Sequence, residues 1–319
     1  MSKRALIIGI WGQDGAYLAR HLLSMGYEVY GGHRRTSSGG PWRLEKLGIR
    51  ERVIPICMDV LDEGSVINAI AYARPDEIYN LAAQGHVGDS WAIPSYTLSV
   101  NSIGALNVFL HMGTARLFHA STLSIFGNDC PDSGFDETSP IRPVDPYGAS
   151  KANAHALAQS YRSKGKFIAQ GIMGNHESPL RQDSFVTQKI ARGVKRWKET
   201  GEPFELHNVI GIRDWGWAPE YVEAMHLMLQ QDRPDDYVLA TGKTAAVKDF
   251  IQAAVGNDGI GVIHGYAINI NGKPLCRFKE WDTGKVAIVS GNPAMAKIKL
   301  GWEAKVHWDE IARRMVEEI

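Results

Sequence analysis

The feature that most constrains the fold is a glycine-rich turn between an apolar segment and a helical segment near the N-terminus. Ala5–Ile10 is a continuous apolar run, which is typical of a strand buried on both faces of a parallel sheet. Gly9, Gly12 and Gly15 follow at G-x-x-G-x-x-G spacing, and apolar residues then recur at helical spacing over Ala16–Met25. Such a turn lets backbone N–H groups and a helix N-terminus approach a pyrophosphate. We therefore expect dinucleotide binding here rather than a plain connecting turn.

The alternation of strand and helix continues along the first half of the chain. It predicts an α/β protein built on a Rossmann-type doubly wound parallel sheet. The strands expected after the first are Tyr27–His33, Arg52–Asp59, Glu77–Ala83 and Arg116–Gly127, and the clearest helices are Asp62–Tyr72 and Ser102–Met112.

Composition limits the possible partners and the compartment. The 319 residues include 35 basic and 35 acidic side chains without a run of like charge, which argues against a nucleic-acid or membrane surface. The three cysteines, Cys57, Cys130 and Cys276, are far apart, fit a reducing compartment and form no C-x-x-C metal or redox motif. No apolar run is long enough for a membrane span or a signal segment. We expect a cytoplasmic protein without a bound metal that acts on a small ligand.

Two arginines indicate which dinucleotide binds. An NAD enzyme places an acidic residue after the second strand for the ribose hydroxyls, whereas this chain has Arg34 and Arg35 there. Arginine accommodates a 2′-phosphate, so we expect NADP, with NAD as the alternative if both side chains are merely solvated in a loop. Asp59, at the end of the third strand, is placed to reach the adenine.

A phenol and an ammonium lie four residues apart where a helix should begin. Tyr147 and Lys151 would then be neighbours on one helix face, and the ammonium would lower the phenol pKa toward the working range. Tyr147 would become a usable general acid/base. The hydroxyls of Ser121, Thr122 and Ser124 are expected at a strand's carboxyl end, the sheet edge at which open α/β proteins bind ligands.

The glycine turn, Leu81–Ala83, Ser121–Thr122 and Tyr147-x-x-x-Lys151 together resemble an extended short-chain dehydrogenase/reductase. Most of the chain further resembles the GDP-mannose 4,6-dehydratase family. The segments that carry this resemblance are Gly12–Gly15, Arg34–Arg35, Glu77–Leu81, Gln84-x-His86-Val87, Asn175–Pro179, Phe185–Thr187, Arg213–Gly216, Tyr221–Met225 and Ala240–Gly242.

The resemblance implies a domain division and a set of binding residues. Residues 1–173, rejoined by about 212–241, would form the NADP-binding Rossmann domain, and 174–211 with 242–319 a smaller, discontinuous substrate-binding lobe. The implied cofactor residues are Gly9, Gly12, Gln13, Asp14, Gly15, Arg34, Arg35, Asp59, Val60, Leu81, Ala82, Ala83, Tyr147, Lys151 and His176. The implied residues for a nucleotide sugar, expected to be GDP-linked, are Gln84, His86, Ser90, Asn175, Glu177, Val186, Lys189 and Arg213. For His86 and His176, a purely structural role is the alternative.

The resemblance also implies a reaction. Tyr147 would remove the proton of the sugar C4 hydroxyl during hydride transfer, Thr122 would share its hydrogen bonds, and Lys151 would hold the tyrosine ionised. A homodimer through paired helices is implied as well, or a homotetramer with the Arg34–Arg35 loop near a neighbouring subunit.

The chain departs from the family pattern at the residue for the second step. Dehydratases carry a glutamate two residues after the catalytic threonine, and Ser124 stands there. A serine hydroxyl is too weak an acid and base to replace it unaided. The alternatives are that Asp89 or Glu177 substitutes, that the serine is a deliberate replacement, or that the protein is a 4-epimerase or 4-oxidoreductase. A binding protein without turnover is a further alternative.

A second departure lies near the C-terminus. The family's Arg-Pro-Thr-Glu-Val-Asp segment, which engages phosphate and ribose, aligns with residues 282–287 of this chain, where aspartate and lysine replace arginine and glutamate. We therefore expect GDP as the nucleotide, whereas the sugar need not be mannose.

Overall fold

The structure is a computed structural model that describes residues 2–35, 39–206, 211–256, 261–264, 267–278 and 287–319. Its largest layer is a seven-stranded sheet in the order β10-β6-β5-β4-β1-β2-β3, in which every neighbouring pair is parallel. The predicted doubly wound sheet is therefore confirmed. The strands are β1 (Arg4–Ile8), β2 (Glu28–His33), β3 (Val53–Cys57), β4 (Glu77–Asn80), β5 (Arg116–Thr122), β6 (Ile168–Met173) and β10 (Asp236–Leu239).

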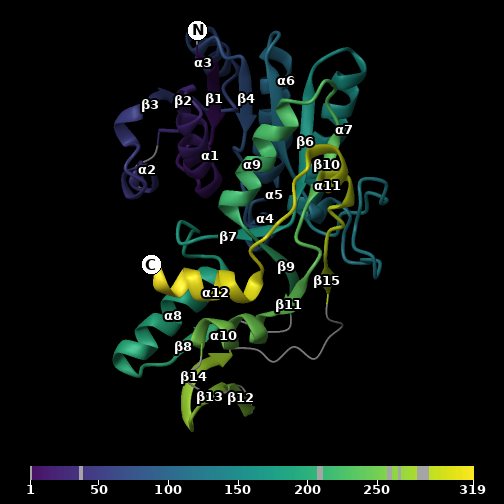
Figure 1. Cartoon of the computed structure of the whole chain (residues 1–319). Coiled ribbons are helices and arrows are strands. Elements are labelled where there is room, and N and C mark those ends of the chain that lie inside the picture. Colours follow the sequence, from purple (N-terminus) through teal and green to yellow (C-terminus); the bar gives the residue numbers. More distant parts are fainter. Residues whose placement is uncertain (1, 36–38, 207–210, 257–260, 265–266, 279–286) are drawn as a thin grey trace.

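Helices cover both faces of this sheet (Figure 1). Side chains of α1 (Gln13–Ser24) and α9 (Ala218–Leu229) form one apolar core with the sheet, whereas α3 (Glu63–Ala73), α6 (Gly104–His111) and α7 (Pro146–Ser163) contribute to the core on the other face. Central strands are buried on both faces, which explains why their sequences are continuous apolar runs instead of alternating ones.

Short elements connect these layers. Two of them, α4 and α5, precede α6 and were not expected from the sequence, because neither is long enough to show a helical period. The short elements are α2 (Trp42–Lys46), η1 (Arg50–Arg52), α4 (Val87–Ala92), α5 (Pro94–Leu98), the π-helical turn η2 (Ser99–Ile103), the 3₁₀ turn η3 (Leu123–Ile125) and α11 (Ala294–Leu300).

Several boundaries near the carboxyl edge of the sheet differ from the predicted ones. The strands β3 and β4 end at Cys57 and Asn80 instead of Asp59 and Ala83, and two further differences affect the site. The first helix begins at Gln13 instead of Ala16, because Gly12 is its N-cap and already has extended backbone. The strand predicted to run to Gly127 ends at Thr122, and the chain then turns through η3. Both differences place more backbone N–H groups and hydroxyls at the sheet edge than the predicted boundaries would.

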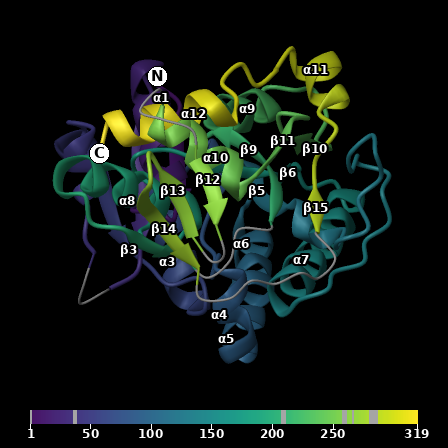
Figure 2. The same ribbon diagram turned by 90° about the horizontal axis from the view of Figure 1, so that it is seen from below.

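A smaller lobe lies against this edge, with the C-terminal helix α12 beside α8 (Figures 1 and 2). Its own core joins side chains of α8, α10 and α12 with two small sheets. One sheet has the order β12-β13-β14-β8, and in the other β9 pairs with β7, β11 and β15. The bounds are β7 (Asn175–Glu177), α8 (Val186–Thr200), β8 (Phe204–Leu206), β9 (Ile212–Trp217), β11 (Thr244–Ala246), α10 (Val247–Val255), β12 (Gly261–His264), β13 (Ala267–Ile270), β14 (Lys273–Phe278), β15 (Ile288–Val289) and α12 (Trp308–Glu317).

The segment expected to rejoin the first domain divides between the lobes. Its α9 and β10 pack on and join the large sheet, while β9 belongs to the smaller one. None of the helices in the described part of the chain has the length and apolar character needed to cross a membrane.

Candidate active site

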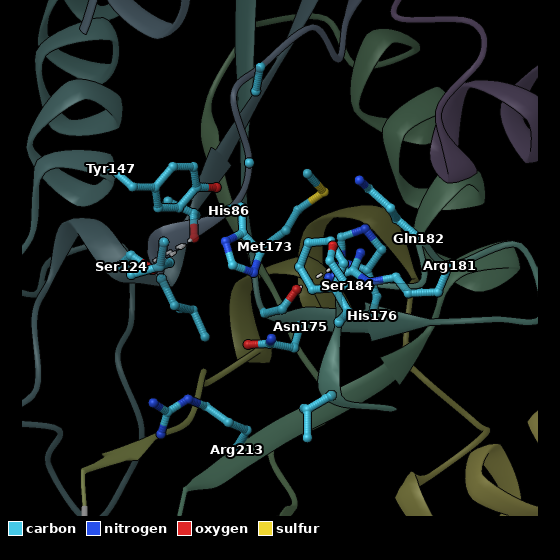
Figure 3. A pocket seen from close by; sticks show the side chains of 18 of the residues that line it. His86, Ser124, Tyr147, Met173, Asn175, His176, Arg181, Gln182, Ser184 and Arg213 are labelled. Atoms are coloured by element: carbon cyan, nitrogen blue, oxygen red, sulfur yellow. Dashed lines mark hydrogen bonds between the residues drawn. The ribbon is translucent and has the colours of Figure 1, made fainter. Parts of the chain in front are cut away.

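A cavity of about 1170 Å³ lies between the carboxyl edge of the large sheet and the smaller lobe (Figure 3). Tyr147 and Arg213 lie on opposite sides of it, with His86, Met173 and Asn175 between them. The cavity collects most of the residues singled out in the sequence. Those that line it are Gly9, Gly12, Gln13, Asp14, Gly15, Leu81, Ala83, His86, Thr122, Ser124, Tyr147, Lys151, Asn175, His176, Val186, Lys189 and Arg213.

The glycine turn at one end of the cavity leaves no room for side chains. A Cβ atom on Gly15 would lie 2.5 Å from the Gly9 carbonyl oxygen, and Gly9 itself has a φ of +96°. The turn therefore brings the N-terminus of α1 directly against the end of β1, with its backbone N–H groups at the cavity. This geometry fits the phosphates of a dinucleotide, which need close backbone approach and the positive end of a helix.

The side chains that follow this turn tie the two lobes together. The Gln13 amide donates to the His176 carbonyl at 3.1 Å and accepts from the Ser178 hydroxyl at 2.7 Å. His176 Nε2 lies 2.9 Å from Asp14 Oδ2, and its Nδ1 lies 2.8 Å from the Gly174 carbonyl oxygen. Both ring nitrogens of His176 are therefore occupied within the protein.

The pKa values of this pair reflect their contact. Burial acts to raise the pKa of Asp14, but the charge and hydrogen bond of His176, with a further bond from Gln13, lower it to about 2. Burial acts to lower the pKa of His176, but Asp14 raises it above its ordinary value. An imidazolium–carboxylate ion pair thus joins α1 to β7.

Helix α7 delivers Tyr147 to the cavity. Asp145 caps the helix by accepting a 2.7 Å hydrogen bond from the Gly148 N–H, and Pro146 occupies the first helical position. A Cβ atom on Gly148 would lie 2.6 Å from the Ser124 carbonyl oxygen. A glycine at 148 therefore lets the start of α7 pack against η3, which brings Tyr147 beside Thr122 and Ser124.

Lys151 lies one turn further along α7 and is 2% exposed. Its Nζ donates to the Ala120 carbonyl oxygen at 2.8 Å, and burial lowers its pKa to about 8. The pKa of Tyr147 is raised because burial outweighs the lowering effects of a Thr122 hydrogen bond and the Arg181 charge. The expected lowering of the Tyr147 pKa by Lys151 is therefore not met, since the lysine bonds a backbone carbonyl and burial favours the neutral phenol.

The Ser124 hydroxyl has one hydrogen-bond partner, the Thr122 hydroxyl, in the part of the chain that is described. Thr122 Oγ1 accepts from the Ser124 N–H at 3.2 Å, and the two hydroxyl oxygens are 3.4 Å apart. Neither is a carboxylate or an imidazole. The pair can bind a sugar hydroxyl, but it has no group of suitable strength to remove a proton from carbon.

Several predicted residues lie away from the cavity lining. Arg34 and Arg35 are exposed beyond β2, where Arg34 contacts the Tyr96 hydroxyl. Asp59 Oδ1 accepts from the Leu61 N–H at 3.0 Å, and Val60 is buried against Gly104. Ala82 follows Leu81 at the end of β4. These five residues surround the carboxyl ends of β2, β3 and β4, next to the glycine turn.

Three predicted substrate residues have protein partners instead. The Ser90 hydroxyl is buried and donates to the Val87 carbonyl at 2.6 Å. Glu177 is buried, pairs with Arg181 at 3.1 Å and accepts from the Thr187 hydroxyl at 2.6 Å. The Gln84 side chain is bonded to the His86 backbone. All three hold the walls of the cavity.

Two cavity residues that sequence reasoning missed are arginines. Arg43 donates to the carbonyls of Leu180 and Trp11 at 2.7 and 2.9 Å, so it joins the turn to the segment after β7. Arg181 lies over the Phe185 ring at 3.8 Å and places positive charge near Tyr147. In the sequence, Arg181 lies between Asn175–Pro179 and Phe185–Thr187. Both segments carry the family resemblance, and this position could have indicated a residue of the site.

The far side of the cavity carries polar and cationic side chains. Lys189 and Asn175 are exposed there, and Arg213 is partly buried and donates to the Ala287 carbonyl at 2.7 Å. The expected counterpart of the family's phosphate-binding segment is residues 282–287, of which 282–286 lie outside the described residues. Elsewhere, in the ranges that the structure describes, no group of three or more His, Cys, Asp or Glu side chains could hold a metal ion.

The fold and the Thr122, Tyr147 and Lys151 arrangement define an extended short-chain dehydrogenase/reductase of the epimerase/dehydratase type. The family model described as GDP-mannose 4,6 dehydratase matches residues 6–315. The chain belongs to this enzyme family. It is 39% identical to GDP-mannose 4,6 dehydratase 1 of Arabidopsis thaliana over 332 residues, covering 99% of this chain and 89% of the relative.

Two solved structures share the fold at lower identity. A Thermotoga maritima UDP-glucose 4-epimerase, solved with UDP-glucose, gives a TM-score of 0.83 at 22% identity over 98% of this chain and 97% of its own. A Thermus thermophilus UDP-glucose 4-epimerase, solved with NAD, gives 0.80 at 24% identity over 98% of both chains.

Replacing Asp14 by Asn should remove the ion pair and lower the free energy of unfolding by about 2 kcal/mol near pH 5.5. The Asp14 contribution is present above its unfolded pKa of 3.8 and is lost as pH falls through about 2. The His176 contribution is complete below 6.5 and is lost as pH rises through its raised pKa. Urea unfolding of both proteins should therefore show a smaller difference near pH 9.

The matched control is Asp132→Asn, a similar change in an exposed loop, which should leave the unfolding midpoint unchanged at both pH values. An equal loss for Asp14→Asn at both pH values would contradict the ion-pair assignment.

Proposed function

We propose that this protein is an NADP-dependent enzyme that modifies a GDP-linked sugar and begins by oxidising C4 of the hexose. The observation that carries the proposal is the convergence of Thr122, Tyr147 and Lys151 on one cavity with the glycine turn. Family membership supports the reaction class, because relatives at this identity are called GDP-mannose 4,6 dehydratases. The cavity is large enough for two extended ligands side by side.

In this proposal Tyr147 accepts the proton of the C4 hydroxyl, and Thr122 holds that hydroxyl by a hydrogen bond. The Arg181 charge and the Thr122 hydrogen bond are the influences that favour ionisation of Tyr147. A nicotinamide dinucleotide on the glycine turn would supply the hydride acceptor. Asn175, Lys189 and Arg213 on the far side would engage the nucleotide diphosphate.

The step that follows C4 oxidation distinguishes two candidate functions. A dehydratase must remove the C5 proton and expel the C6 hydroxyl, whereas a 4-epimerase or 4-oxidoreductase works at C4 alone. Ser124 favours the second class, because a hydroxyl is a poor base toward a carbon acid. The family match favours the first.

The test is incubation of enzyme, NADP and GDP-mannose in deuterated water, followed by nicotinamide absorbance and by mass spectrometry and NMR of the sugar. We expect reduction of NADP, and Tyr147→Phe should slow it by about 100-fold or more because the base is lost. Tyr161→Phe, on the same helix but packed against Phe109, should be unaffected.

The product then decides between the two classes. A 4-keto-6-deoxy sugar with deuterium at C5 identifies a dehydratase, and an unlabelled C5 identifies the alternative. If C5 labelling is slow, Ser124→Glu should raise it. Full activity of Tyr147→Phe would reject the proposed site.

We infer NADP as the preferred cofactor from Arg34 and Arg35, which stand where an acidic residue would bind the ribose of NAD. Replacing both by alanine should weaken NADP binding by about 10- to 100-fold and leave NAD binding within a few-fold, since only the 2′-phosphate contact is lost. Calorimetric titration measures both. The control is Lys164→Ala, which removes a positive charge at the C-terminal end of α7. Tighter binding of NAD by the unmodified protein would overturn the inference.

We further propose a homodimer through the helices that cover the α6 side of the sheet. Ile103, the last residue of η2, and Leu110 of α6 are seven residues apart and are 50% and 43% exposed, and Trp91 of α4 is 65% exposed. Sedimentation should show a dimer that Leu110→Glu converts to monomer. Ile298→Glu, at an even more exposed residue on α11, should remain dimeric. A monomeric wild-type protein would contradict the proposal.

A further inference from the structure

The two arginines expected to select the cofactor follow β2, and the structure holds the side chain of only one of them, within the part of the chain that it describes. Nη1 of Arg34 donates a hydrogen bond to the hydroxyl of Tyr96. Arg35 is exposed, and its side chain has no hydrogen-bond or ion-pair partner among the described residues. The contact with Tyr96 therefore distinguishes two arginines that the sequence pattern treats alike.

The contact between Arg34 and Tyr96 joins two segments on either side of the glycine turn. Arg34 follows β2, whereas Tyr96 belongs to α5, which comes after β4 in the chain. In the sheet, β1 lies between β4 and β2, and β1 leads into the glycine turn. A dinucleotide on such a turn places its adenosine ribose at the carboxyl end of the second strand. The contact thus lies at the end of the site where a 2′-phosphate would distinguish NADP from NAD.

The backbone that carries Arg34 is fixed against the glycine turn. The Gly9 N–H donates to the Gly32 carbonyl at 2.9 Å, which joins the turn to the end of β2. The ring of His33 stacks on the indole of Trp11, with ring centroids 3.9 Å apart. His33 Nδ1 lies 3.2 Å from the Arg34 carbonyl oxygen, and because a carbonyl can only accept, this nitrogen is the donor. Arg34 therefore extends from a backbone with a defined position.

The helix that carries Tyr96 is anchored as well. Thr97, the next residue, is fully buried, and its hydroxyl donates to the Ile93 carbonyl at 2.9 Å. Just beyond α5, Asn101 donates to the Ser150 hydroxyl of α7 at 2.9 Å. Tyr96 itself is 37% exposed, so its hydroxyl reaches Arg34 from the outer side of an element whose inner side is packed.

The chemistry of the partner leaves the arginine free to bind an anion. A phenol accepts a hydrogen bond from a guanidinium without neutralising its charge, as a carboxylate would. Among the described residues, Arg34 forms no ion pair with an aspartate or a glutamate. A guanidinium has several N–H donors in a planar fork that matches a phosphate. Arg34 can therefore keep its bond to Tyr96 and still offer charge and donors to a phosphate.

We propose that Tyr96 is a positioning residue that holds the guanidinium of Arg34 for the ribose 2′-phosphate of NADP. This inference rests on the proposed preference for NADP, and it assigns the recognition to Arg34 more than to Arg35. The physical reason is preorganisation. An arginine that is already held loses less side-chain freedom when the phosphate binds, and more of the charge-assisted hydrogen bond then appears as affinity.

The test is calorimetric titration of the full-length protein with NADP, NAD, 2′,5′-ADP and 5′-AMP, because each pair differs only in the 2′-phosphate. Tyr96→Phe, which removes the hydroxyl alone, should weaken NADP and 2′,5′-ADP by about three- to tenfold. The affinities for NAD and 5′-AMP should stay within about twofold. The matched control is Tyr72→Phe on α3, a tyrosine that is 63% exposed, and it should bind all four ligands as the wild type does.

A double-mutant cycle shows whether Tyr96 acts through Arg34. In the Arg34→Ala background, Tyr96→Phe should cause no further loss of NADP affinity, whereas in the Arg35→Ala background it should keep its full effect. A purely structural role would weaken all four ligands alike, so equal losses would overturn the proposal. NADP binding that is unchanged or tighter in Tyr96→Phe, or a full effect of Tyr96→Phe in the Arg34→Ala background, would overturn it too.

The wild-type protein separates a failure of this inference from a failure of the proposed cofactor. A wild type that binds 2′,5′-ADP no more tightly than 5′-AMP would overturn the NADP preference and the role of Tyr96 together. A wild type that prefers 2′,5′-ADP but shows no coupling between positions 96 and 34 would overturn the role of Tyr96 alone. In both cases the oxidation at C4 is decided by the separate experiment with GDP-mannose.

Discussion

The contact between the start of α7 and the end of β5 determines the chemistry of the cavity. Gly148 packs its backbone against the Ser124 carbonyl, and Asp145 completes the helix start by capping it. A Cβ atom at 148 would lie 2.6 Å from that carbonyl oxygen, so a side chain there would require the helix start or η3 to shift. Lys151 is placed by the same contact, because it stands one turn further on the same helix.

Burial at this contact also determines the protonation states. Burial shifts both groups towards their neutral forms, since the phenol pKa of Tyr147 is raised and the ammonium pKa of Lys151 is lowered to about 8. At neutral pH the phenol keeps its proton and most of Lys151 is still an ammonium ion. It is suited to donate hydrogen bonds to a developing oxyanion, and it needs added positive charge, of the kind Arg181 supplies, before the phenol can act as a base.

Sequence reasoning identified the elements that depend on local pattern. The glycine turn was predictable because only glycine fits at positions 9 and 15, and the α7 start was predictable because Tyr147 and Lys151 stand at helical spacing. Arg43 and Arg181 were not predictable, because each is aimed by carbonyls or carboxylates of distant segments. The substrate roles assigned to Ser90 and Glu177 remain predictions, and their buried positions show them bonded within the protein. A motif identifies which residues gather but not which of them face the ligand.

The segment after β4 and the start of α7 form connected walls of the cavity. Oxidation at C4 needs only groups from β5 and α7, which the Gly148 contact assembles. The segment that follows β4 reaches the same helix through Gln84, Asn101 and Ser150, whose hydrogen bonds run from the His86 backbone towards α7. Because that network ends on the Tyr147 carbonyl, the wall of the cavity formed after β4 is held relative to the helix start that carries Tyr147.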